Sequence, residues 1–480
     1  MVLSVFGTRL GGLAVLLSLS GCAQGLIGDA GLVPLMSVRE EAEVGRVQHP
    51  RMLVNFGGAY NDPALDAYIG ELTAKLANRA GTPDVRKVTV LNTPGVNAFA
   101  LPGGYIYVTR GLLALANDEA ELAMVIAHEI GHVAARHPAK RIARLASAEI
   151  LDNPIGRFFS LDQARMIDTL GSEGYVALYS RRQEFEADSL GIRLAAKAGY
   201  LPEASTSFLR SMGRDQARRI AGLAGKKTKA QGDYMSAHPP TPARLTEAEK
   251  VVASLPASGE RRREDYLSRI DGLVYGDARE NGVVRGREFL QPVLGFAFKV
   301  PPGFAIHNRP NAIVALGPNR AVILFDGALV DNTKPITDYL TQDWADKIAL
   351  TGVRPIRIRG LEAATGYASL GNREVRLVAI RQDGERIYRF IIMDGAGTLA
   401  KLEGEYLKFV NSFRQLGATE ARSVQPLRIR VQTVRPGDTA ESLGARMPIS
   451  KRKSERFRVL NGLRRGEQPR VGQRVKLVVG

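Results

Sequence analysis

Two histidines and a glutamate give the clearest sign of chemistry in this chain. His128, Glu129 and His132 stand in the run His-Glu-Ile-Gly-His. On an α-helix, residues four apart lie on one face, one turn from each other. Two neutral imidazoles so placed can bind one Zn²⁺, and Glu129 then lies beside the metal position, where its carboxylate can accept a proton from water. We therefore predict one zinc ion per chain, in the site of a hydrolytic enzyme.

The flanking residues favour a buried helix around this run. The run Asn117-Asp118-Glu119 offers an N-cap and acidic residues for the first turn, and Pro138 predicts that the helix ends soon after His137. Apolar side chains on nearly all sides indicate burial, where imidazoles and a carboxylate are costly unless something pairs them. The alternative is a chance match, with both histidines hydrogen-bonded to carbonyl groups. The chain has only six histidines, which argues against chance.

A catalytic zinc site needs a third protein ligand, and the helix predicted near residue 184 offers one. Glu184 and Asp188 share a face at i and i+4, whereas Glu186 is roughly 200° around the helix from Glu184. We assign Glu184 as the third ligand. Asp188 is assigned to accept the free ring N–H of a ligand histidine. The alternative is a solvated acidic face paired with Arg181 and Arg182.

These residues together resemble the gluzincin family that includes HtpX and the CAAX prenyl proteases, and within it the soluble periplasmic BepA-like members. The segment from Asn97 to Leu113 resembles the strand that precedes the zinc helix in that group, and the segment from Ser236 to Leu245 resembles its His-Pro…Arg segment. The similarity covers about residues 36–250. BepA-like proteins often carry helical repeats after the protease, and none is visible in this sequence.

The resemblance implies roles for further residues. It implies that His238 occupies the open metal position in a resting enzyme or stabilises the oxyanion, with Arg244 as its support; a loop histidine without a role is the alternative. Asn97, Ala98 and Phe99 would belong to a strand that pairs with the substrate backbone, unless that strand is simply buried sheet.

The N-terminus predicts export. Residues 1–21 read as a lipoprotein signal peptide, and Leu-Ser-Gly-Cys22 resembles a bacterial lipobox. Cys22 is the only cysteine in the chain, so no intrachain disulfide can form. Ala23 after the cysteine indicates, by resemblance to lipoprotein sorting, the outer membrane. We expect a periplasmic protein, lipid-anchored to that membrane; a plain secretory signal is the alternative.

The remaining chain predicts a multidomain protein. We expect a tether (22–36), a mainly α-helical (α+β) zincin protease domain (37–255), a linker (256–289), an α+β domain of unknown role (290–416) that faintly resembles PsbP-like domains, and a small βααβ domain (427–479). The last resembles a LysM module, a family that binds N-acetylglucosamine polymers including peptidoglycan. His49, His137 and His307 show no partner pattern, and we assign them no role.

Charge is concentrated at the C-terminus. Residues 421–480 hold 15 Lys and Arg against 4 Asp and Glu, so they contribute +11 of the net charge of +17. Such a basic segment attracts polyanions. In an exported protein we expect the anionic cell wall or lipid head groups rather than nucleic acid, with solubility alone as the alternative.

The sequence therefore predicts a zinc metalloendopeptidase in protein quality control, with polypeptide substrates and peptidoglycan as the partner of its LysM-like unit. By resemblance, the substrates are misfolded or misassembled envelope or outer-membrane proteins. Two alternatives stay open. One is a peptidoglycan hydrolase targeted by the LysM-like unit, and the other is a chaperone-like binding protein whose zinc site is latent.

Overall fold

The structure is a computed structural model that describes residues 37–81, 85, 87–141, 179–222, 238, 241–310, 312–330, 334–370, 373–393 and 403–480. The predicted signal segment, the tether and Cys22 lie outside the described residues. Among the described helices, none combines the length and the apolar character needed to cross a membrane.

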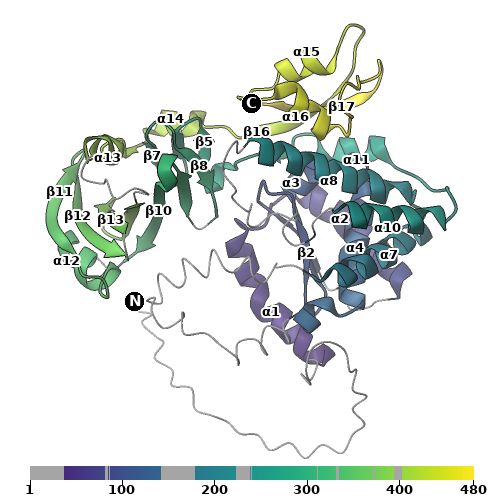
Figure 1. Ribbon diagram of the computed structural model, residues 1–480, viewed down its shortest axis with the longest axis horizontal. Coiled ribbons are helices and arrows are strands. Elements are labelled where there is room, and N and C mark those ends of the chain that lie inside the picture. The colour runs from purple at the N-terminus through teal and green to yellow at the C-terminus, as the bar shows by residue number, and fades with distance from the viewer. Residues whose placement is uncertain are drawn as a thin grey trace, which may run out of the picture.

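The N-terminal part consists of helices packed around one small sheet (Figure 1). Its helices are α1 (Val38–Asn55), α2 (Pro63–Ala80), α3 (Arg110–Leu115), α4 (Glu119–Ala134), α7 (Arg181–Lys197), α8 (Glu203–Gly222), α10 (Pro242–Ala253) and α11 (Arg263–Ile270). Its strands are β1 (Lys87–Leu91), β2 (Ala98–Leu101) and β3 (Tyr105–Thr109). The sheet order is β1-β3-β2; β1 runs parallel to β3, and β2 runs antiparallel to β3.

Helix α4 carries the two histidines and lies at the centre of this part. Every residue from Glu119 to His132 is buried, and α2, α7, α8, α11 and β2 all pack against the helix. The N-cap falls within the predicted run, at Asp118, whose side chain accepts a hydrogen bond from the backbone N–H of Glu121 at 2.8 Å. It ends at Ala134, before His137, so it is shorter than Pro138 predicts.

A sheet-rich unit follows the helical part and forms a separate lobe in Figure 1. Its four-stranded sheet has the order β15 (Arg414–Gln415), β7 (Phe296–Lys299), β6 (Glu288–Gln291), β5 (Val283–Arg285). Its seven-stranded antiparallel sheet has the order β11 (Thr351–Ile358), β12 (Leu361–Leu370), β13 (Arg373–Arg381), β14 (Arg386–Met393), β10 (Val322–Leu329), β9 (Ile313–Leu316), β8 (Ala305–Asn308). Short helices complete it: α12 (Ile336–Asp338), α13 (Glu403–Val410) and α14 (Ala418–Ser423).

The C-terminal unit has the predicted order of strand, two helices and strand. Its elements are β16 (Leu427–Thr433), α15 (Ala440–Ala445), α16 (Lys453–Leu460) and β17 (Arg474–Val479). A third strand, β4 (Val274–Tyr275), extends its sheet in the order β17-β16-β4. Residues 256–289, expected as a linker, thus contribute α11 to the helical core and β4 to the C-terminal sheet.

Candidate metal centre

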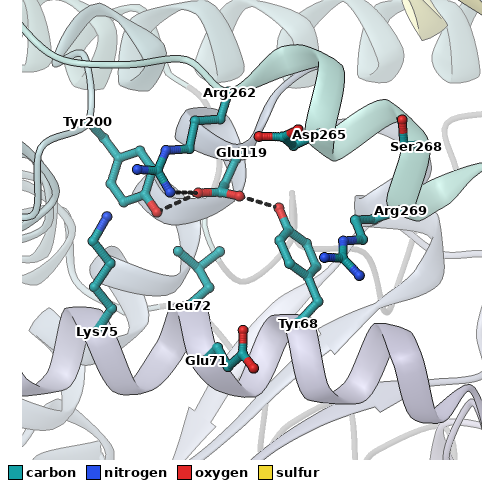
Figure 2. Close-up of a pocket in the computed structure, with 10 residues that line it drawn as sticks. All are labelled: Tyr68, Glu71, Leu72, Lys75, Glu119, Tyr200, Arg262, Asp265, Ser268 and Arg269. Carbon is teal, nitrogen blue, oxygen red and sulfur yellow. Dashed lines mark hydrogen bonds and ion pairs between the residues drawn. The ribbon is translucent and has the colours of Figure 1, made fainter.

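The N-terminal end of α4 is anchored by its first residue. The carboxylate of Glu119 accepts hydrogen bonds from the hydroxyls of Tyr68 at 2.8 Å and Tyr200 at 2.7 Å, and Arg262 lies 3.6 Å away (Figure 2). A cavity of about 570 Å³ opens at this junction. Its Glu119, Tyr68, Tyr200 and Arg262 side chains already pair with one another. The junction joins α2, α4, the start of α11 and the segment that follows α7, and it lies nine residues, or about 14 Å of helix, from His128.

Glycines allow α4 to approach α7 closely. A methyl group on Gly191 of α7 would lie 2.8 Å from the backbone N of His128, and one on Gly131 of α4 would lie 3.1 Å from the carbonyl oxygen of Ala187. Both helices therefore meet backbone against backbone at this crossing. The close approach brings the acidic face of α7 to the histidines of α4.

Four buried side chains converge at this crossing. The Nε2 atoms of His128 and His132 lie 3.0 Å apart, and His238 Nδ1 lies 3.2 Å from His128 Nε2. Glu184 Oε1 lies 2.8 Å from His238 Nδ1 and 3.5 Å from His132 Nε2. One ligand atom from each of the four lies within 4.8 Å of every other. The structure therefore brings the three predicted ligands together with His238.

This cluster fits a tetrahedral zinc ion. With zinc–ligand bonds near 2.0–2.1 Å, neighbouring ligand atoms in a tetrahedron lie roughly 3.4 Å apart. Four of the six separations, between 2.8 and 3.5 Å, fall around that value, and all six are within 4.8 Å. Imidazole lone pairs that point at one another, as on His128 and His132, repel unless a cation or proton lies between them. Nitrogen and carboxylate oxygen are also the donors that zinc prefers.

Asp188 supports both a ligand and the segment that carries His238. Its Oδ1 lies 2.9 Å from His128 Nδ1, the ring nitrogen that faces away from the cluster. Arg244 donates to both Asp188 oxygens at 2.7 and 2.8 Å, and to the carbonyl oxygen of His238 at 2.9 Å. Arg244 Nη1 also lies 2.9 Å from Glu184 Oε2. The guanidinium of Arg244 thus holds three groups in place: the carboxylates of Glu184 and Asp188 and the backbone carbonyl of His238.

The electrostatics keep the ligand carboxylate ionised. Burial alone would raise the pKa of Glu184, but His238, His132 and Arg244 hold it well below its usual range. Burial lowers the pKa of His132 well below its usual range, so its ring stays neutral. An ionised carboxylate and a neutral imidazole are the forms that bind zinc.

Glu129 lies beside the cluster and is fully buried. Neither of its carboxylate oxygens hydrogen-bonds to a described residue, and Oε1 lies 3.8 Å from His238 Nε2. Burial raises the pKa of Glu129 to about 7. A buried carboxylate without a hydrogen bond is costly, so its position here suits a group that exchanges a proton with a bound molecule.

The side chains of the predicted substrate strand are buried, but the strand lies at the edge of its sheet. Ala98 and Phe99 belong to β2, which pairs only with β3 among the described strands and packs against α4. Asn97 precedes β2, and its side-chain amide is buried without a hydrogen-bond partner among the described residues. Pairing of β2 with a substrate stays a prediction.

Sequence reasoning missed two residues that contact His132. His137 Nδ1 lies 2.8 Å from His132 Nδ1, and the ring of Tyr179 stacks on that of His132 at 3.9 Å between centroids. The guanidinium of Arg141 lies 4.7 Å above the Tyr179 ring. The clustering of histidines near the motif could have indicated that His137 contacts the site. No pattern of residues around Tyr179 indicates its contact with His132.

Comparison with known protein families matches this part of the chain. Residues 63–252 match the model of peptidase family M48. This segment is similar to that family, and we refer to it as the M48 domain. The beta-barrel assembly-enhancing protease of Yersinia pestis is 30% identical over 272 residues, covering 53% of this chain and 54% of that protein. The mitochondrial metalloendopeptidase OMA1 of Arabidopsis thaliana is 38% identical over 153 residues, covering 32% of this chain and 29% of that protein.

The M48 match and the names of these relatives support a metalloendopeptidase activity for this segment. The chain spans about half the length of the beta-barrel assembly-enhancing protease and less of OMA1. Among solved structures, PsbP from Synechocystis sp. PCC 6803 aligns with a TM-score of 0.23 and 13% identity, over 29% of this chain and 98% of that chain. A likeness at this level carries no inference, so the PsbP-like and LysM-like resemblances stay predictions.

Proposed function

We propose that this protein is a zinc-dependent endopeptidase of the bacterial cell envelope that cleaves misfolded or misassembled envelope or outer-membrane proteins. The observation that carries the proposal is the convergence of His128, His132 and Glu184 beside Glu129, whose carboxylate accepts no hydrogen bond from a described residue. The M48 match and the relatives named beta-barrel assembly-enhancing protease support the peptidase and the substrate class.

In this proposal, His128, His132 and Glu184 would hold the zinc ion, which would supply a Lewis acid for the peptide carbonyl. Glu129 accepts a proton from the attacking water and passes it to the leaving amine. Burial raises the pKa of Glu129, which favours its taking up that proton before it passes it on. Asp188 and Arg244 keep the ligands oriented through their hydrogen bonds.

We also propose that His238 is the fourth zinc ligand in the resting state. Its Nδ1 lies inside the cluster, 2.8 Å from Glu184 Oε1 and 3.2 Å from His128 Nε2. A fourth protein ligand closes the position that a catalytic zinc ion leaves open for water or substrate. The segment around residue 238 would then have to move before peptide cleavage.

Localisation and wall binding are further parts of the proposal. The signal peptide and Cys22 support export and lipid anchoring at the outer membrane, and the LysM-like unit with its excess of basic residues supports binding to peptidoglycan. The position of His238 favours one second candidate, a chaperone-like binding protein whose zinc site is latent.

The test compares the form starting after Cys22 with its Glu129→Gln and His238→Ala variants, measuring zinc content and casein cleavage. We expect one zinc per chain in all three, cleavage abolished in Glu129→Gln, and faster cleavage in His238→Ala. Zinc without cleavage in any form would favour the latent binding protein. Digestion of purified peptidoglycan by the same samples would favour the wall hydrolase instead.

A further inference from the structure

A reversal of the chain after α4 returns His137 to the zinc helix. Were α4 to continue, His137 would lie five residues beyond His132 and about 140° away around the helix. Instead the helix ends at Ala134, and Arg136 adopts the left-handed backbone conformation, with a φ of 54°. The turn places His137 Nδ1 2.8 Å from His132 Nδ1 and leaves His137 buried.

Arg136 is held in this conformation by the N-terminal helix. Its Nε donates to Glu41 Oε1 of α1 at 2.6 Å, and its Nη2 contacts the same oxygen. A left-handed conformation is unfavourable for a residue with a Cβ, so surrounding contacts must enforce it. The Arg136–Glu41 pair therefore fixes the geometry that carries His137 to His132.

The direction of the hydrogen bond follows from which nitrogen of His132 faces the cluster. His132 Nε2 points at His128 Nε2, so a metal takes that nitrogen and the ring proton must sit on Nδ1. His132 Nδ1–H then donates to His137 Nδ1, which accepts. The proton of His137 must lie on Nε2, 3.4 Å from Glu186 Oε2.

We propose that His137 is a positioning residue for the metal ligand His132, fixing its tautomer and ring orientation by accepting the hydrogen bond from Nδ1. The inference rests on the proposed zinc site and adds a support that differs in kind from that of His128. The carboxylate of Asp188 supports His128, whereas a neutral ring supports His132. Partners of this sort hold ligand histidines in place and raise metal affinity.

The experiment compares the zinc affinity of the parent with that of His137→Leu and His137→Asn, by competition with a chromophoric chelator. Leucine removes the acceptor. Asparagine places its amide oxygen near the position of Nδ1 and restores an acceptor. We expect His137→Leu to weaken zinc binding about 10- to 100-fold and His137→Asn to bind nearly as tightly as the parent.

Two further readouts separate positioning from general damage. Absorption of the cobalt(II)-substituted forms reports ligand geometry, and we expect it to change in His137→Leu and to match the parent in His137→Asn. His307→Leu, which alters a histidine of β8 outside the M48 domain, is the control and should leave affinity and spectrum unchanged.

The outcomes distinguish this inference from the zinc site itself. A parent that binds no zinc would overturn both. A parent that binds zinc, with His137→Leu equal to it in affinity and spectrum, would overturn only the role of His137. If His137→Leu does not fold, His137→Ala replaces it. Equal weakening in the alanine and asparagine variants would then show that the hydrogen bond does not matter.

Discussion

The two units that follow the M48 domain in sequence differ in whether they share its hydrophobic core. The sheet-rich unit has hydrophobic cores of its own, one of them built around seven phenylalanines between its two sheets. The C-terminal unit has no separate core among the described residues, because its buried residues belong to the same cluster as α2 and α4. The unit farther away in sequence is thus the one packed into the protease.

The contact between the C-terminal unit and the M48 domain surrounds the turn that leads into α4. Lys476 of β17 is fully buried, and its Nζ donates to the carbonyl oxygens of Ala114, Leu115 and Ala116 at 2.8, 3.3 and 2.5 Å. The three carbonyl oxygens are the hydrogen-bond acceptors of this buried amino group. They belong to the end of α3, where helix carbonyls lack partners within the helix.

The difference teaches that a basic C-terminal module is here part of the scaffold of the zinc helix. Its outer surface carries exposed basic residues, while its inner side fills the M48 core. The sheet-rich unit, by contrast, is an insertion between β4 and β16. Those two strands are neighbours in one sheet, with Tyr275 paired to Leu427.

The largest effect should follow from removing each unit in turn. Truncation after Val424 exposes the shared core, and we expect the melting temperature of the zinc-bound M48 domain to fall by on the order of 10 °C or more. Excision of residues 276–426, with Tyr275 joined to Leu427 by Asn-Gly as in a two-residue hairpin, should leave the M48 domain folded and zinc-bound. Calorimetry measures the melting temperature of both variants. An equal fall in the two would contradict the conclusion that only the C-terminal unit packs into the M48 domain.

A large but confined effect is expected in the sheet-rich unit. Phe325 packs against Phe296, Phe298 and Phe390 in the core between the sheets. Phe325→Ala should destabilise that unit by about 3–5 kcal/mol, because the cavity removes ring contacts. In denaturant titrations, tryptophan fluorescence from Trp344 should report earlier unfolding of this unit. The denaturant concentration at the midpoint of zinc release should not change. A shift of that midpoint equal to the shift in Trp344 fluorescence would show that the two parts unfold together.

Lys476 should matter more than any exposed lysine of the same unit. Lys476→Met keeps the length of the side chain but leaves three buried carbonyl groups without their donor, so we expect a loss of about 3 kcal/mol from the free energy of unfolding of the zinc-bound protein. Lys451→Met, at an exposed position, is the matched control and should change it by less than about 0.5 kcal/mol. Urea denaturation measures the free energy of unfolding of both variants. Equal losses would show that Lys476 does not stabilise the interface.

The smallest effect tests how closely the C-terminal unit approaches the M48 domain. Gly462 and Gly466 both have a positive φ, so alanine is strained at either by about 1–2 kcal/mol. A methyl group on Gly462 would also lie 3.1 Å from Asn117 Nδ2, whereas none of the described atoms lies within 4 Å of one on Gly466. We expect Gly462→Ala to cost about 1 kcal/mol more than Gly466→Ala. Thermal unfolding of both variants measures this difference.

Much of the site follows from local spacing. The pairs His128 with His132 and Glu184 with Asp188 each share a helix face, and the structure brings both faces together. His238 and Arg244 were expected near the metal only from the resemblance, and both contact the cluster. His137 was left without a role because its position in the sequence shows no partner pattern, and only the turn after α4 brings it to His132.

The sequence by itself determined what depends on neighbours along the chain. Helical periodicity sets which side chains share a face, and the order of strands and helices in residues 427–479 follows from local patterns of apolar and turn residues. The tertiary structure alone decided what depends on distant segments meeting. The left-handed turn at Arg136 requires Glu41 of α1, and the burial of Lys476 requires the end of α3. The sequence near Arg136 or Lys476 does not indicate either partner, because a hydrogen bond between residues far apart in the chain produces no local sequence pattern.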